Sequence, residues 1–273
     1  MTLAQQNMHF PTVSLSVRSG NTPRFSPASL ALTYKRYLNA TTEVLCETLW
    51  PTRCVVCDRP GTLLCEPCRL NLHYIDYWRS CPRCGGPNGL IQCSECNPVI
   101  LADLSRATLP FTNCVSAVLF DSATARLIRA FKDSNERGLA AIMATLIINT
   151  IPPAWYNSRP LPTICFIPST KKAYARRGFD HCELLATQVG HLSKLKVEAL
   201  LARPHNKDQR ELTRKDRITN MANRFDVQAE IIPPKVLLID DVYTTGSTLC
   251  AASDALLQKG ARQVFCATFA RVW

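Results

Sequence analysis

The stretch "VLLIDDVYTTGST", Val236 to Thr248, joins an apolar run to two carboxylates and then to small and hydroxyl-bearing residues. The apolar run predicts a strand of a parallel sheet, with Asp240 and Asp241 at the carboxyl edge where open α/β folds bind ligands. The next residues predict a turn that offers N–H groups and hydroxyls to an anion at a helix N-terminus. That turn comprises Thr244, Thr245, Gly246, Ser247 and Thr248. A sugar 5-phosphate fits the pattern, because vicinal hydroxyls would donate to the two carboxylates.

Other phosphate motifs do not describe this stretch. The chain contains neither G-x-x-x-x-G-K-[ST] nor G-x-G-x-x-G, the signatures of Walker-type loops and of dinucleotide sites. An acidic helix cap after a buried strand is the plainer alternative. It accounts for one Asp or one Ser but not for the whole arrangement.

Apolar runs alternate with helical periods through the second half of the chain. Strand-like runs occupy 114–120, 163–167, 235–240 and 263–268, and helix-like stretches occupy about 123–132, 137–149, 180–195 and 246–259, the last closed by Gly260. This alternation predicts an α/β fold with a parallel sheet flanked by helices.

Eight of the fourteen cysteines form four C-x-x-C pairs, which predict two zinc sites with four thiolate ligands each. We expect sequential pairing, because short loops close with less entropy than interleaved ones, although a cross-brace stays open. Both sites would be structural. Redox-active pairs are the rival interpretation, but no thioredoxin-like context surrounds them. The expected ligands are Cys54, Cys57, Cys65 and Cys68 for one ion and Cys81, Cys84, Cys93 and Cys96 for the other.

The other six cysteines stand mostly in apolar contexts, where we expect small core residues. They are Cys46, Cys114, Cys165, Cys182, Cys250 and Cys266.

Composition narrows the class of protein. The 273 residues include 47% apolar residues and carry a formal charge of +11, which indicates phosphate-bearing partners. No apolar run is long enough to span a membrane and no secretory signal is evident, so we expect a cytoplasmic protein without membrane insertion. Residues 1–44 form a non-core extension, read as a disordered tail, an over-long translation start or a transit peptide.

The whole pattern resembles the ComF/GntX family of type I phosphoribosyltransferase-like proteins. The resemblance rests on Val236 to Thr248, "LWPTRCVVC" before the cysteine pairs, "LIRAFK" at 127–132, "KKAYARRGFDHCELLA" at 171–186 and the basic stretch 206–225. It implies a double zinc ribbon over 45–100, a phosphoribosyltransferase-like domain over 101–273, and phosphoribosyl pyrophosphate (PRPP) with Mg²⁺ as ligand.

The resemblance also implies a pyrophosphate loop at "IPSTKKAYARRGF". Its cations can neutralise a diphosphate, and Arg177 can hold it bidentately, although a solvated basic loop is the plainer alternative. These cations are Lys171, Lys172, Arg176 and Arg177. Asp180 and His181 replace the family's usual Asn-Gln pair, and we expect a helix cap and a surface contact there, with His181 not a catalytic base.

If the chain is an enzyme, Asp240 and Asp241 would hold the ribose hydroxyls and Arg177 would assist the leaving pyrophosphate. We count these three as candidate catalytic residues; the acceptor cannot be read from the sequence. The alternative is a PRPP-sensing adaptor without turnover, or a regulator whose ligand opens or closes a hood.

An excess of cations favours a second polyanion as partner. Residues 168–225 contain thirteen Lys or Arg against six Asp or Glu, more than one diphosphate needs. Single-stranded DNA or a helicase-type competence protein would fit the resemblance, whereas a solvated hood over the site is the alternative. The surplus cations are Arg203, Lys207, Arg210, Arg214, Lys215, Arg217 and Arg224.

Overall fold

A computed structural model describes residues 51–103, 106–157, 159–202 and 225–273. The chain divides into two compact units, Met1–Pro51 and Thr52–Trp273, and every described residue except Pro51 lies in the second. The expected extension 1–44, Cys46 and the surplus cations from Arg203 to Arg224 lie outside the described residues.

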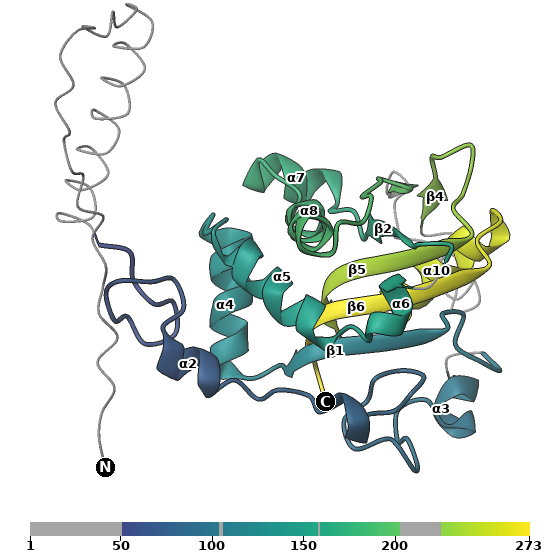
Figure 1. Cartoon of the computed structure of the whole chain (residues 1–273), viewed down its shortest axis with the longest axis horizontal. Coiled ribbons are helices and arrows are strands. Elements are labelled where there is room, and N and C mark those ends of the chain that lie inside the picture. Colours follow the sequence, from purple (N-terminus) through teal and green to yellow (C-terminus); the bar gives the residue numbers. More distant parts are fainter. Residues whose placement is uncertain (1–50, 104–105, 158, 203–224) are drawn as a thin grey trace, which may run out of the picture. The chain divides into compact units, whose positions relative to one another are not determined.

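The second unit is built on a four-stranded parallel sheet in the order β1-β6-β5-β2, with helices on both faces (Figure 1). The strands are β1 (Asn113–Leu119), β2 (Thr163–Phe166), β5 (Lys235–Tyr243) and β6 (Gln263–Arg271), with β3 (Leu201–Ala202) and β4 (Asp226–Val227) paired separately. The longer helices are α4 (Ser122–Asp133), α5 (Leu139–Thr150), α8 (His181–Ser193) and α10 (Ser247–Gln258). The shorter ones are α2 (Glu66–Leu70), η1 (Tyr77–Arg79), α3 (Pro98–Asp103), α6 (Pro153–Asn157) and α7 (Lys171–Arg177).

This architecture confirms the parallel sheet with flanking helices that the alternating pattern predicts. Each of the four expected strands and four expected helices forms close to its expected bounds. Helix α10 has Lys259 as its C-cap, and Gly260 follows in a left-handed conformation (φ 113°) that a glycine adopts without strain.

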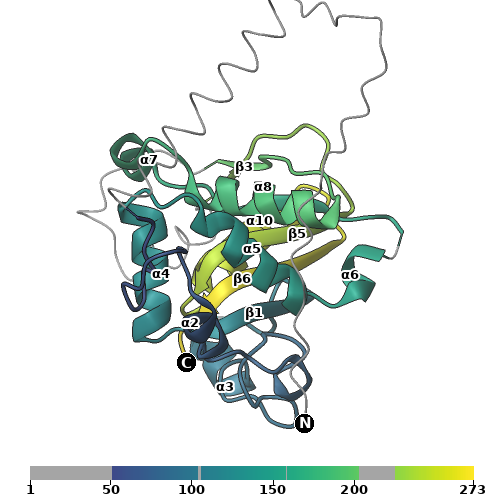
Figure 2. The same ribbon diagram turned by 60° about the vertical axis from the view of Figure 1, so that its left-hand side comes forward.

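The two faces of the sheet have separate apolar cores, because successive side chains of a strand point to opposite faces. Leu237, Ile239 and Phe265 join one core with α4, α5 and α8, whereas Leu238 and Cys266 join the other with α10. Turning the molecule shows α5 and α8 on the near side of β5 and β6 (Figure 2).

Both edges of the sheet are covered by backbone from elsewhere in the chain. On the β1 side, Ile75 N donates to Ala117 O (3.0 Å) and Leu119 N donates to His73 O (2.8 Å). On the β2 side, residues 196–198 pair with Ile164. The sheet therefore presents few unpaired backbone groups at its edges.

Two local expectations need correction. Strand β5 does not end at Asp240 but continues to Tyr243, because β6 extends alongside it as far as Arg271. The neighbour on the other side, β2, ends opposite Ile239, so the two carboxylates still lie beyond the end of a strand. The expected pyrophosphate loop is largely the helix α7, which Thr170 caps by accepting from Ala173 N (3.1 Å) and which ends at Gly178 (φ 75°).

Candidate functional site

Asp240 and Asp241 are buried at the carboxyl end of the sheet, 7% and 4% exposed. Buried carboxylates are unfavourable unless a partner neutralises or hydrogen-bonds them. The two side chains meet this requirement differently, and their different partners give them different protonation states.

Asp241 is ionised and paired. Lys132, near the end of α4, forms an ion pair with its Oδ2, and His181 Nε2 lies 3.8 Å from its Oδ1. Burial by itself would raise the pKa of Asp241, but the bond from His181 and the charge of Lys132 hold it well below its usual range. Burial also opposes the charge on Lys132, yet attraction to Asp241 raises the pKa of Lys132 overall.

Asp240 has a raised pKa because it is buried beside the charged Asp241. Burial and then the negative charge of Asp241 raise its pKa from 3.8 to about 7, although the Asp241 N–H donates to its Oδ1 at 2.9 Å. The thiol of Cys182 also donates to Oδ1 (3.4 Å), and burial raises the pKa of that thiol well above its usual value. Asp240 therefore keeps its proton more readily than Asp241 does, and Lys132 neutralises the charge of Asp241.

The cation Arg177 approaches the carboxylates from the end of α7. Its side chain is 13% exposed, its Nη2 lies 3.4 Å from Asp133 Oδ1, and its Nη1 donates to His181 Nδ1 (3.2 Å). Because Nδ1 accepts, the neutral ring carries its proton on Nε2, toward Asp241. The buried Nε of Arg177 has no hydrogen-bond partner among the described residues, so a donor is left for an anion.

The turn after β5 is an open cradle at the start of α10. Thr244 and Thr245 are exposed, and Thr245 Oγ1 lies 3.0 Å from Ser247 Oγ. Gly246 is the N-cap of α10 with φ 74°, a conformation that a side chain would strain. A twelve-residue helix starting at Ser247 points its free N–H groups and positive dipole end toward this turn.

A cavity of about 350 Å³ brings these groups together. Of the predicted ligand residues, five line it: Arg177, Asp240, Asp241, Thr244 and Thr248. Six do not: Lys171, Lys172, Arg176, Thr245, Gly246 and Ser247. Among the latter, Arg176 Nη2 instead pairs with Asp133 Oδ1 (3.0 Å) on the surface.

Lys132, His181 and Cys182 line the cavity but were not predicted as site residues. Lys132 had a local signal: it follows Ile128 by four residues and so shares the buried face of α4, where a lysine is unusual. Cys182 is buried, as expected for an unpaired cysteine, but it also lines the cavity.

The expectation for His181 is wrong. It is buried rather than on the surface, because it begins α8 where that helix packs over β5, and it bonds to Ser169 Oγ (2.9 Å). The expected helix cap at Asp180 is confirmed, since its Oδ1 accepts from Cys182 N (3.0 Å) and Glu183 N (3.3 Å).

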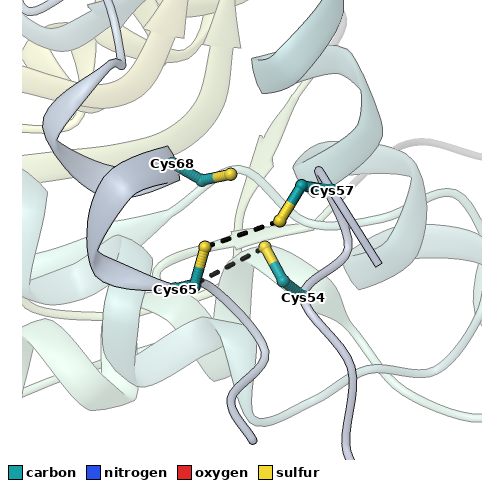
Figure 3. Close-up of side chains that lie close together, drawn as sticks. All are labelled: Cys54, Cys57, Cys65 and Cys68. Atoms are coloured by element: carbon teal, nitrogen blue, oxygen red, sulfur yellow. Dashed lines mark hydrogen bonds between the residues drawn. The ribbon is translucent and has the colours of Figure 1, made fainter. Parts of the chain in front are cut away.

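The paired cysteines gather into two groups of four, in the sequential order that the loop lengths favour. Cluster 1 contains Cys54, Cys57, Cys65 and Cys68, and cluster 2 contains Cys81, Cys84, Cys93 and Cys96. In cluster 1 the four sulfur atoms turn toward a common centre (Figure 3). The Sγ atoms of Cys57 and Cys65 in cluster 1 lie 3.6 Å apart, and those of Cys84 and Cys93 in cluster 2 lie 3.5 Å apart. Tetrahedral zinc with Zn–S bonds of about 2.3 Å requires sulfur atoms about 3.8 Å apart, so both groups fit a zinc ribbon.

One cysteine of each cluster has a lowered thiol pKa, which favours the thiolate form that binds a metal. Burial raises the pKa of Cys54, but backbone N–H donors such as that of Cys65 (3.4 Å) lower it overall to about 6. In cluster 2, a bond from Cys84 lowers the pKa of Cys81 to about 4. Each cluster therefore forms one thiolate readily, and a metal would let the others ionise. The described cysteines form no disulfides, and the five described unpaired ones are buried as expected.

An acidic pair, a hydroxyl-rich turn and a parallel sheet together define a phosphoribosyltransferase-like protein. The phosphoribosyl transferase domain family matches residues 175–272. The DNA utilization protein YhgH of Salmonella typhi is 26% identical over 200 residues, 68% of this chain and 82% of the relative. Competence protein F of Haemophilus influenzae is 31% identical over 145 residues, 50% and 63% of the two chains, and competence protein ComFC of Streptococcus pneumoniae is 33% identical over 98 residues, 36% and 43%. The chain therefore carries a phosphoribosyl transferase domain and is similar to DNA utilization and competence proteins.

None of the described helices combines the length and the apolar character that crossing a bilayer requires.

Proposed function

We propose that the chain binds PRPP with Mg²⁺ in the cavity at the carboxyl end of β5. The observation that carries this proposal is the convergence of Arg177, both aspartates, Thr244 and Thr248 on one cavity. The 5-phosphate fits the turn at the N-terminus of α10, and the diphosphate fits the unpartnered Nε of Arg177. The ribose hydroxyls would donate to Asp240 and Asp241, the latter shared with Lys132.

We further propose that bound PRPP is a phosphoribosyl donor. The C1–O bond to the diphosphate breaks, its electron pair leaves with the diphosphate, and a lone pair of the acceptor bonds to C1. Arg177 and Lys132 would stabilise the departing charge, so positioning and electrostatics carry the reaction rather than a covalent nucleophile. Mg²⁺ would enter with PRPP beside Asp240 and Asp241 and would supply positive charge that neutralises the diphosphate. The basic residues of α7 that do not line the cavity would attract the diphosphate from outside it. These are Lys171, Lys172 and Arg176.

The clusters complete the proposal. We assign Zn²⁺ to each as a structural ion over 45–100, preceding a catalytic or binding domain over 101–273, because four thiolates leave no open coordination position. Eight reduced cysteines require a reducing compartment, which favours the cytoplasm.

Calorimetry tests the ligand. PRPP with Mg²⁺ should bind the wild type and fail to bind Asp240→Asn/Asp241→Asn, which loses the hydroxyl acceptors. Asp76→Asn is the matched control, because Asp76 caps η1 and does not line the cavity. Pyrophosphate release is followed in the same samples with candidate acceptors. Absence of PRPP binding by the wild type would contradict the proposal.

The relatives' names favour a second candidate, a PRPP-sensing adaptor for single-stranded DNA or a competence partner. These names refer to competence and DNA utilization. An adaptor would bind PRPP without releasing pyrophosphate, and would bind single strands with a steep salt dependence. Titrating labelled single-stranded DNA at two salt concentrations separates the two candidates.

A further inference from the structure

The turn Thr244–Thr248, which we call the phosphate turn, lies against the buried aromatic ring of Tyr243. Tyr243 ends β5 and lies so close to Gly246 that a Cβ on the glycine would overlap the tyrosine hydroxyl. Gly246 carries the left-handed conformation from which α10 starts. The ring therefore sets the course of the backbone that presents N–H groups to a phosphate.

Arg271 of β6 stacks its guanidinium on that ring. It lies opposite Tyr243 in the sheet, and its guanidinium carbon is 3.7 Å from the centre of the tyrosine ring. The next residue, Val272, donates its N–H to Tyr243 O (2.9 Å). Arg271 is 0% exposed, and a buried guanidinium is unfavourable unless acceptors surround it.

Those acceptors belong to cluster 2. Arg271 Nη1 donates to Cys84 O (2.7 Å), and Nη2 lies 3.7 Å from Cys84 Sγ and forms an ion pair with Glu95. Glu95 sits between two cysteines of the cluster, Cys93 and Cys96. The loops that would hold the metal are therefore the loops that hold Arg271.

Cluster 2 is also fixed to the sheet. Cys84, Tyr243 and Leu249 of α10 belong to one continuous apolar core. Gly85 approaches β1 so closely that a Cβ there would collide with Cys114 O, and Cys114 N donates to Arg83 O (2.9 Å). A shift of the cluster would thus be felt at the ring and at the first turn of α10.

We propose that Arg271 is a positioning residue that couples cluster 2 to the phosphate turn, so that a metal in this cluster strengthens binding of a ribose 5-phosphate group. This rests on the proposed function, which places the 5-phosphate in that turn. The metal fixes Cys84 and Glu95, these fix Arg271, and Arg271 fixes the ring beneath Gly246. The diphosphate end of the cavity, at Arg177, has no part in this chain of contacts.

The test measures ribose 5-phosphate and pyrophosphate binding separately by calorimetry, on the full zinc-loaded chain. Arg271→Lys keeps the charge but loses the planar stack and the paired donors, and Glu95→Gln is a milder change on the same contact. Both should weaken ribose 5-phosphate about fivefold to tenfold and leave pyrophosphate unchanged. The matched control is Arg126→Lys, since Arg126 Nη1 donates to Val56 O of the cluster 1 segment (2.6 Å).

The outcomes are distinct. Wild-type protein that binds neither ligand refutes the proposed function itself. Wild-type binding that Glu95→Gln leaves intact for both ligands overturns the coupling. If Arg271→Lys binds neither ligand and shows no cooperative melting transition, that variant has unfolded. The Glu95→Gln variant then decides: weaker binding of ribose 5-phosphate alone supports the coupling, and equal weakening of both ligands overturns it.

Discussion

The two cysteine clusters share the C-x-x-C motif, with seven residues between the pairs in cluster 1 and eight in cluster 2, but they join different apolar cores. Cys54 and Cys65 of cluster 1 join the core of α4, α5 and α8, the helices that bring Lys132 and His181 to Asp241. Cluster 2 joins the core of α10 and contacts the ring below the phosphate turn through Arg271. Two similar groups of four cysteines are therefore connected to opposite ends of one cavity, and the difference lies in the residues that each cluster contacts.

The largest expected effect separates the clusters directly. Cys84 is fully buried beside Arg271, whereas Cys57 is exposed. Cys84→Ser should lower the melting midpoint by more than about 10 °C, because loss of a structural metal removes folding free energy and leaves buried groups without support. Cys57→Ser should lose one zinc ion with a smaller shift. Differential scanning calorimetry with zinc analysis checks this, and equal shifts would break the comparison.

Asp240 lines the cavity, and its raised pKa makes the free energy of unfolding depend on pH. A carboxyl group that binds its proton more tightly when folded lowers stability as pH rises from about 4 to about 7. Asp240→Asn should therefore be more stable than the wild type at pH 8, by at most about 4 kcal/mol, with the difference vanishing near pH 4. Urea unfolding across this range measures the trend. A constant difference at all pH values would mean that Asp240 is not the titrating group.

Lys132 belongs to α4, which packs in the same core as cluster 1, so substituting it tests that end of the cavity. Lys132→Met leaves Asp241 buried without its counter-charge and should cost about 3 kcal/mol at pH 7. Lys132→Met/Asp241→Asn should recover much of that loss, since no ion remains unpaired. Urea unfolding of the four-member cycle gives the coupling. If the two substitutions are additive, the pair does not stabilise the site.

The smallest effect concerns two neighbouring arginines. Arg177 lines the cavity, whereas Arg176 pairs with Asp133 on the surface. Arg176→Gln should change unfolding free energy and pyrophosphate affinity by less than about 1 kcal/mol, but Arg177→Gln should weaken pyrophosphate clearly. Calorimetry on both variants compares them, and a larger loss for Arg176 would shift the diphosphate site outward along α7.

Much of the fold was predictable because its signals are local. The four parallel strands are continuous apolar runs, the cysteine grouping follows from loop lengths, and the turn after Asp241 carries its own composition. The roles of His181 and Cys182 were not predictable in this way. They depend on how α8 packs over β5, which no sequence window contains. Arg271 lies beyond the expected strand 263–268, and its contacts with Tyr243 and Cys84 depend on β5 and cluster 2, which are distant in the sequence.

The sheet order has a consequence for how the protein is made. Strand β1 lies between the segment His73–Ile75 and β6, which is the last described strand in chain order. A ribosome delivers both cysteine clusters and β1 early, yet the parallel partner of β1 and the guanidinium that Cys84 accepts arrive only with β6. During synthesis, cluster 2 is therefore complete before Arg271 arrives, so a metal taken up early would be bound without this final neighbour.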